Sequence, residues 1–71
     1  MEDSDREGVV ADGLVSVREA ERFLSIKKSK LYQLMDRGDL PYVKLGAARR
    51  IPRRALVSWA ARHLIIHQDG T

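Results

Sequence analysis

The chain has 71 residues, no cysteine and a formal net charge of +3. This length fits one domain near the lower limit for folding on a hydrophobic core, and the lack of cysteine excludes disulfides and thiolate metal sites. No apolar run approaches the roughly 20 residues that span a bilayer, and the acidic N-terminus lacks the order of a signal peptide. We therefore expect a soluble intracellular protein with no membrane partner.

Charge is unevenly distributed along the chain. Residues 1–13 carry five acidic residues against one arginine, whereas residues 14–71 carry a formal charge of +7. A small basic body suggests a polyanionic partner, although an ordinary soluble domain that happens to be basic fits the composition equally well. Residues 1–13, acidic and glycine-punctuated, are predicted to form a disordered tail.

A first helix is predicted over residues 17–24. Ser16, with Glu19 three residues later, matches a capping box, and Val17, Ala20 and Leu24 recur at helical spacing. The short link "SIKK" follows, and Ile26 is expected to fill the corner that it makes.

A second helical pattern covers "SKLYQLMDR" and ends at Gly38. Leu31, Leu34 and Met35 form one narrow apolar stripe, while Ser29, Gln33 and Asp36 point the opposite way. Two short helices joined by a few residues predict a helix-turn-helix unit.

A hairpin and a third helix are predicted next. Val43 and Leu45 alternate with Lys44 in a first strand, and "RRIP" returns as a second strand with Ile51 turned inward. The turn between them is "GAA", and Pro52 should end the strand and open the helix "RRALVSWAARHL". The expected core consists of Leu14, Leu24, Leu31, Leu34, Val43, Ile51, Leu56 and Trp59.

The order helix, turn, helix, hairpin, helix predicts a mainly α fold with a small β-hairpin, a winged helix-turn-helix. We expect this domain to cover residues 14–64, preceded by the acidic tail 1–13 and followed by a short tail 65–71. Leu64, Ile65 and Ile66 exceed what one helix face can bury, so they either form an exposed partner surface or fold back on the core.

Catalytic and cofactor patterns are missing from the sequence. Its serines lack a His–acid relay, and no phosphate-cradling glycine loop occurs. His63 and His67 have the spacing of a helical metal pair but no third ligand, and His63 is better explained as a residue at the edge of the core. We expect a non-enzyme that takes no cofactor, metal or small-molecule ligand.

The second helix carries the groups that DNA recognition needs. Lysines neutralise phosphates, while Ser and Gln side chains can reach base edges in the major groove. The alternative is an ordinary solvated helix face, but the predicted architecture favours recognition. The candidate contacts are Lys27, Lys28, Ser29, Lys30, Tyr32, Gln33 and Arg37.

The hairpin, or wing, is the second candidate contact. Lys44, Arg49 and Arg50 lie on a narrow arm that can follow the DNA backbone or place an arginine in the minor groove. Alternatively, Arg49 and Arg50 only keep an exposed edge strand from pairing with another chain. Arg53 and Arg54 begin the third helix, where positive charge opposes the helix dipole, which hints at a phosphate contact.

The segments "VSVREAERFL", "LYQLMDRGDLPYVKLG" and "RRIPRRAL..W", in this order, resemble the MerR-like winged-helix domain of the excisionase family. The resemblance covers about residues 14–63 and departs from the family at Lys27, where serine or threonine is usual, and near Arg49, where an aromatic residue is common. It implies a recombination directionality factor of the bacterial cytosol and nucleoid that binds and bends attachment-site DNA. The implied partners are double-stranded DNA, an integrase, and further protomers on the same DNA.

Two other functions remain open on the sequence. One is a small MerR-like transcriptional repressor of a phage or mobile element, using the same DNA-binding domain. The other is a protein-interaction module whose basic face meets an acidic protein.

Overall fold

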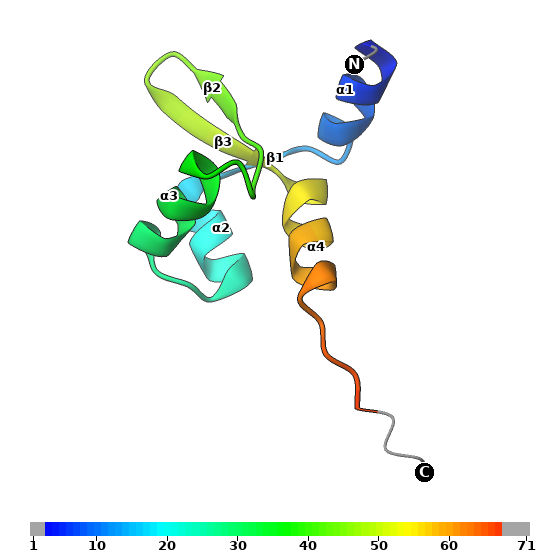
Figure 1. Ribbon diagram of the computed structural model, residues 1–71. Coiled ribbons are helices and arrows are strands. Elements are labelled where there is room, and N and C mark those ends of the chain that lie inside the picture. Colours follow the sequence, from blue (N-terminus) through cyan, green and yellow to red (C-terminus); the bar gives the residue numbers. More distant parts are fainter. Residues whose placement is uncertain (1–2, 68–71) are drawn as a thin grey trace.

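The protein is a winged helix-turn-helix, as the sequence predicts. The computed structural model describes residues 3–67, in which four helices accompany one three-stranded antiparallel sheet. In chain order the elements are α1 (Asp3–Val10), β1 (Leu14–Ser16), α2 (Val17–Leu24), α3 (Lys28–Asp36), β2 (Val43–Leu45), β3 (Ala48–Pro52) and α4 (Arg53–Arg62). The β2–β3 hairpin projects from the body above α3, and α1 lies at the side of the sheet (Figure 1). Residues 1–2 and 68–71, the outermost parts of the two predicted tails, lie outside the described residues.

Helix α2 begins where the capping pattern predicts. The Glu19 backbone N–H donates to the Ser16 hydroxyl at 3.0 Å, and the Ser16 backbone N–H donates to the Glu19 carboxylate at 3.1 Å. The hydrogen bond from the Ser16 backbone lowers the pKa of Glu19, and Arg53 and Arg22 nearby lower it further. Because the folded pKa lies below the unfolded one, the stabilisation is complete above the unfolded pKa and is lost as pH falls through the folded value.

Ser16→Ala is expected to lower the free energy of unfolding by about 1 kcal/mol, because the Glu19 N–H then lacks its acceptor. Urea unfolding at neutral pH, followed by circular dichroism, measures the loss. Repeating the measurement with Ser16→Asp supplies the control, because an aspartate can cap the helix and should recover most of the stability.

Strand β1 was not predicted, and it makes β3 the central strand of the sheet. The sheet order is β1-β3-β2, with Val15 opposite Ile51 and Ser16 opposite Arg50 on one side. On the other side Lys44 lies opposite Arg49 and Leu45 opposite Ala48. Three residues carry no strand signal of their own, so β1 forms only because β3 offers it a partner.

The hairpin turn is shorter than predicted. It consists of Gly46 and Ala47 alone, because Ala48 already belongs to β3. Gly46 has a φ of 64°, the positive value that a two-residue turn of type II′ requires at its first position. Pro52 ends the strand and caps α4, as predicted.

The predicted inward face of β2 is wrong. Cross-strand partners lie on the same face, so Lys44 shares a face with Arg49 and, two residues along, with buried Ile51. Val43 and Leu45 therefore point to the other face, where Val43 is half-buried and Leu45 is 54% exposed. At the hairpin the inner side of the sheet no longer covers core, so charged residues occupy it.

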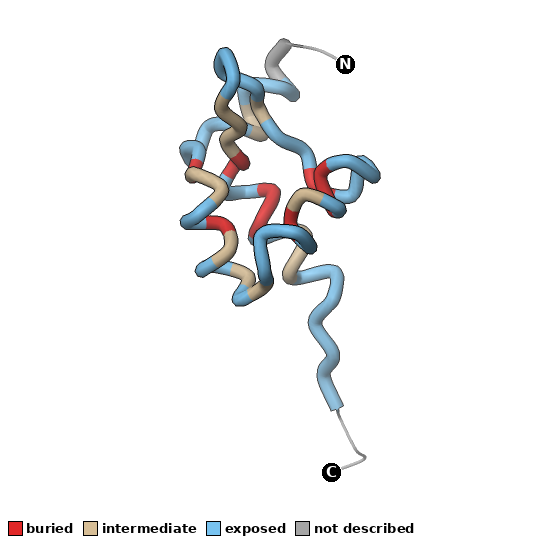
Figure 2. Tube along the Cα trace, turned by 90° about the vertical axis from the view of Figure 1, so that its left-hand side faces the viewer, coloured by how far each residue is buried: buried red, intermediate tan, exposed pale blue. Residues whose placement is uncertain are grey.

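The core fills the space between the inner face of the sheet and α2, α3 and α4. Buried segments from all these elements meet at the centre (Figure 2). Leu24 and Trp59 pack against the core as partly buried residues, whereas Leu14 is 38% exposed and its predicted core position is wrong. The buried core residues are Val15, Ala20, Leu31, Leu34, Met35, Leu40, Ile51, Ala55 and Leu56, and Pro52 at the end of β3 is buried as well.

The disorder predicted for the N-terminal tail is wrong for Asp3–Val10, which form helix α1. Acidic residues near a helix N-terminus interact favourably with the helix dipole. A helix this short is unstable in isolation, and packing against α4 supplies the missing stability. Val9 and Val10 line a cavity of about 500 Å³ that the outer sheet face completes with Val43 and Pro52.

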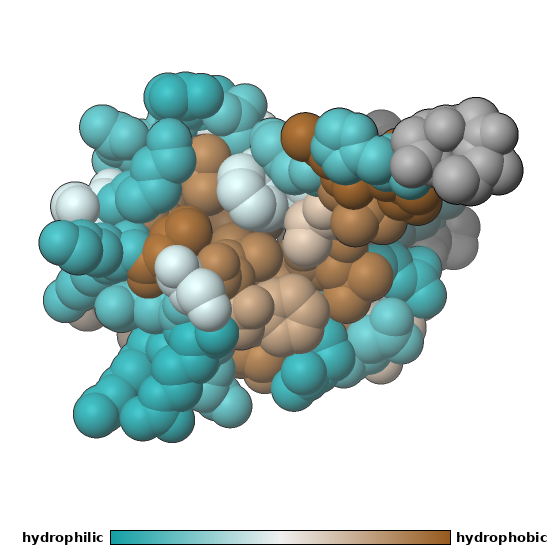
Figure 3. All heavy atoms as spheres, turned by 90° about the horizontal axis from the view of Figure 1, so that it is seen from below, coloured by the Kyte–Doolittle hydropathy of each residue, from teal (hydrophilic) through white to brown (hydrophobic). Residues whose placement is uncertain are grey.

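At the other end of the chain, α4 stops at Arg62 and the following residues have no regular structure. Leu64, Ile65 and Ile66 are 66%, 76% and 66% exposed, so this segment does not fold back on the core. Apolar side chains gather on the lower face of the molecule, surrounded by polar residues (Figure 3). No helix within residues 3–67 has the length and hydrophobicity to cross a membrane.

Candidate nucleic-acid interface

Helix α3 is held by one buried side and presents the opposite side to solvent. Leu31, Leu34 and Met35 are its buried residues, as predicted. The helix ends at Asp36, and Gly38 follows its C-cap residue with a φ of 81°, which turns the chain back over the last helical turn. The Gly38 N–H donates to the Met35 carbonyl at 3.1 Å. The Asp39 N–H reaches the Leu34 carbonyl at 2.9 Å, which completes a Schellman motif. These contacts fix which face α3 exposes.

The predicted contacts of α3 lie on that exposed side and its two flanks. Lys27, Lys28, Ser29, Lys30, Gln33 and Arg37 are all exposed, whereas Tyr32 is partly buried. The N-cap position of α3 is occupied by Lys27, and its side chain makes no capping hydrogen bond. Three lysines therefore stand around an uncapped helix N-terminus, which concentrates positive charge there.

Arg49 does not project from the wing as a free cation. Its guanidinium lies 4.9 Å from the Tyr32 ring centroid and 4.5 Å from that of Tyr42. One guanidinium nitrogen, Nη1, also binds the Asp36 carboxylate at 3.2 Å, and the side chain is only 25% exposed. Arg49 thus fastens the wing to α3, whereas the sequence predicted that it would face DNA.

The Asp36 pair has a second consequence for the exposed face of α3. Asp36 shares that face with Ser29 and Gln33, where a carboxylate would repel phosphates. The ion pair with Arg49 offsets this negative charge. The surface that α3 and the wing present together is therefore more positive than the helix sequence alone suggests.

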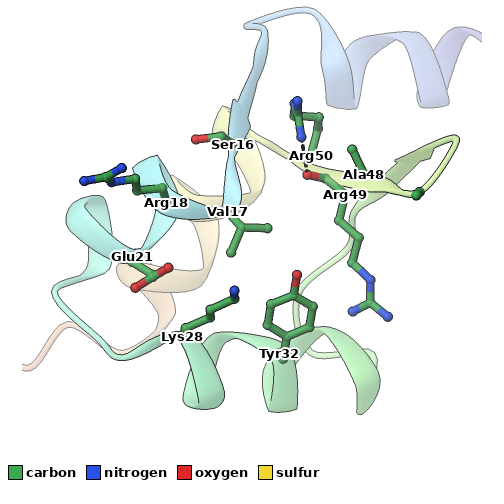
Figure 4. A pocket seen from close by; sticks show the side chains of 10 residues that line it. Ser16, Val17, Arg18, Glu21, Lys28, Tyr32, Ala48, Arg49 and Arg50 are labelled. Atoms are coloured by element: carbon green, nitrogen blue, oxygen red, sulfur yellow. Dashed lines mark hydrogen bonds between the residues drawn. The ribbon is translucent and has the colours of Figure 1, made fainter.

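Arg50 points away from α3, because neighbouring residues of a strand face opposite sides (Figure 4). Its guanidinium donates to the Arg49 carbonyl at 2.9 Å, and the residue is partly buried. Arg50 is paired with Ser16 on one side and Val43 on the other, so it does not guard a sheet edge. Lys44 is exposed on the edge strand β2, beside Arg49.

A groove of about 480 Å³ lies between α2, α3 and the wing (Figure 4). Lys28 and Tyr32 line it from α3, and Arg49 and Arg50 line it from β3. Arg18, in the first turn of α2, also lines the groove and was missed by sequence reasoning. Arg18 could have been found from the capping pattern, because it lies two residues after the cap Ser16. A helix that starts beside β3 places its first turn next to the wing.

The remaining predicted cations make contacts within the fold. Arg37 pairs with Asp39 at 2.8 Å on the flank of α3 away from the wing. Arg54 pairs with Asp12 at 3.3 Å. The acidic N-terminal segment therefore supplies an ion-pair partner for one of the two arginines at the start of α4. The Arg53 backbone N–H donates to the Gly13 carbonyl at 2.9 Å, which ties the same segment to the helix.

The two histidines do not share a helix. Helix α4 ends at Arg62, before His63 and His67, which removes the helical spacing on which a metal pair depends. His63 is exposed rather than at the core edge, and its ring stacks on Trp59 with centroids 4.1 Å apart. Among the described residues, no three His, Asp or Glu side chains cluster as metal ligands would.

Comparisons with known proteins agree with this architecture. The sequence profile of the helix-turn-helix domain family matches residues 14–64. A protein named "Probable excisionase", from Saccharopolyspora erythraea, is 41% identical over 57 residues, which cover 80% of this chain and 57% of the relative. The chain thus spans little more than half the length of the curated relative it matches, and no solved structure matches it significantly.

The relative confirms the resemblance to excisionases, whereas the MerR-like part of that resemblance stays a prediction. The profile begins at Leu14, where β1 starts, and ends two residues after α4. It therefore covers α2, α3, the wing and α4 together. By sequence and by structure, the chain belongs to the helix-turn-helix domain family.

Proposed function

We propose that this protein is a non-enzymatic excisionase that binds double-stranded DNA through α3 and the wing. The observation that carries the proposal is the groove at the base of the wing, where the cations Arg18, Lys28 and Arg50 outnumber the carboxylate of Glu21. Affinity for DNA comes mainly from phosphate neutralisation, and these cations come from three separate elements. Similarity to a protein named as an excisionase supports the recombination role.

In the proposed complex α3 enters the major groove, which is wide enough for a helix. Ser29 and Gln33 then face base edges, and Lys27, Lys28 and Lys30 contact phosphates around the helix N-terminus. The wing follows the backbone with Lys44 and Arg50, which lie on its two opposite faces. Arg49 holds the angle between the wing and α3, so the two contacts reach DNA as one rigid surface.

We further propose that the protein bends attachment-site DNA and helps an integrase to excise its element, with neighbouring protomers assisting one another. Footprinting on candidate attachment-site DNA, with and without the cognate integrase, followed by an excision assay, tests this. Protection together with stimulated excision is expected. Protection without stimulated excision would favour the repressor function, and no duplex binding at low salt would favour a protein-interaction module.

Gln33→Ala is expected to change the preference among DNA sites more than the overall affinity. A glutamine amide can bind the N6 and N7 edge of adenine, and such a pair discriminates by about 1–3 kcal/mol against the wrong base. Competition between the best site and its single-base-pair variants measures the loss. Affinity for random duplex, which reports phosphate contacts alone, should stay close to that of the parent; an equal loss on every sequence would contradict the assignment.

A further inference from the structure

A second basic cavity lies on the flank of α3 that faces α4, away from the wing. It has a volume of about 390 Å³ and lies between one flank of α3 and the last turn of α4. We call it the α3–α4 pocket. Its lining residues are Lys30, Leu34, Arg37, Asp39, Trp59, Arg62 and His63.

Two cations in this pocket have no ionic partner among the described residues. Arg37 is neutralised by Asp39 at 2.8 Å, and within the described part of the chain no other carboxylate lines the cavity. Lys30 and Arg62 form no ion pair with a described carboxylate, and both are exposed. The pocket therefore carries an excess of positive charge that the fold itself does not use.

Two aromatic side chains that line the pocket pack against each other. Trp59 and His63 stack with their ring centroids 4.1 Å apart. His63 Nδ1 lies 2.7 Å from the Trp59 carbonyl oxygen, and since a carbonyl can only accept, Nδ1 carries the hydrogen. Arg62 lines the same pocket from the last turn of α4, where a positive charge interacts favourably with the helix dipole.

The α3–α4 pocket and the wing lie on opposite sides of the exposed face of α3. At 100° per residue, Ser29 and Gln33 mark the exposed middle of the helix, Lys28 and Tyr32 follow on the wing side, and Lys30 and Arg37 lie on the opposite side. A helix in the major groove has a phosphate backbone on each side of it, because the groove is only about 12 Å wide. The wing can reach one of these backbones but not the other.

We propose that the α3–α4 pocket binds the DNA backbone on the side of the major groove opposite the wing, with Lys30 and Arg62 as its phosphate contacts. This inference rests on the proposed function. It assigns to α4 a direct part in DNA binding, and it makes the interface a clamp with cations on both sides of the recognition helix.

The test compares the parent with Arg62→Gln, which leaves Lys30 in place, on specific and random duplexes over a range of salt concentrations. We expect about a fivefold loss of affinity on both duplexes and a log–log salt slope reduced by about one unit, since each lost phosphate contact lowers it by about 0.9. Arg22→Gln is the matched control, because it removes the same charge at the cavity beside Phe23, away from both proposed contact surfaces. Circular dichroism establishes that both variants fold.

Phosphate ethylation interference shows which backbone is contacted. The parent should show interfering phosphates on both sides of the bound major groove, and Arg62→Gln should lose interference only at phosphates away from the wing. If the parent binds but Arg62→Gln behaves like the Arg22→Gln control, the inference is wrong and the proposed function stands. If the parent itself binds no duplex, the proposed function fails.

Discussion

Arg49→Ala is expected to weaken binding to all DNA sequences by more than tenfold, because it frees the wing from α3. The variant loses one ion pair and contacts with two tyrosine rings, each worth about 0.5–1 kcal/mol. Asp36 is also left without its partner on the face that meets DNA. Duplex affinity by fluorescence anisotropy and unfolding by urea measure the two effects.

Arg49→Lys separates a role in holding the wing from a role in binding phosphate. Lysine keeps the positive charge but lacks the planar guanidinium that can lie against two rings while binding a carboxylate. If Arg49 fastens the wing, the lysine variant should bind DNA nearly as poorly as the alanine variant. If Arg49 contacts phosphate, lysine should restore most of the affinity, which would contradict the structural role.

Arg50→Lys is the matched control for this pair of variants. Arg50 adjoins Arg49 on β3 but points to the other face, and within residues 3–67 its guanidinium hydrogen-bonds only to the Arg49 carbonyl. Exchange for lysine should therefore cost little in affinity or stability. A large loss there would mean that any change on β3 disrupts the wing, and the effect at Arg49 would no longer be specific.

Local signals made much of the fold predictable from the sequence. The capping pair Ser16 and Glu19 gave the bounds of α2, and Gly38 gave the end of α3, because each signal depends on residues within one helical turn. The apolar stripe of α3 was predictable for the same reason. The exposed face of the recognition helix followed directly from that stripe.

Features that depend on distant partners could not be predicted in the same way. Strand β1 exists because β3, more than 30 residues later, hydrogen-bonds to it, and α1 exists because α4 supports it. Leu40 is fully buried although it stands in a loop between Asp39 and Pro41, where no periodicity marks it. The sequence of a short chain predicts its periodic helices and strands, but it does not predict which of them pack or pair with one another.

In the candidate site, too, local features were predictable and contacts between distant residues were not. Exposed residues of α3 were found from helical spacing alone, whereas the role of Arg49 depends on Asp36, Tyr32 and Tyr42 at once. No single spacing in the sequence brings these four residues together, since they come from a helix, a loop and a strand. Arg18 and Arg62 were missed because they belong to α2 and α4, which sequence reasoning treated only as support for α3.

Leu31→Ala is expected to destabilise the fold far more than Ser16→Ala or any change to the wing. Leu31 is fully buried in the centre of the core, and truncating a buried leucine typically costs about 2–5 kcal/mol through lost burial and the cavity that remains. A domain below about 70–80 residues rarely has more than 3–5 kcal/mol from one core, so the variant should be largely unfolded at 25 °C. Circular dichroism without denaturant measures the folded fraction.

Leu45→Ala is the matched control, because it removes the same atoms from a leucine that is 54% exposed at the wing. Its stability should fall by less than about 1 kcal/mol, since little apolar surface returns to water. The same pair tests how folding supports DNA binding. Excess duplex should restore helical signal to Leu31→Ala, because a ligand that binds only the folded state shifts the folding equilibrium toward it. If duplex restores no structure, the proposed DNA binding is contradicted. If Leu45→Ala unfolds as completely as Leu31→Ala, the assignment of the core around α3 is wrong.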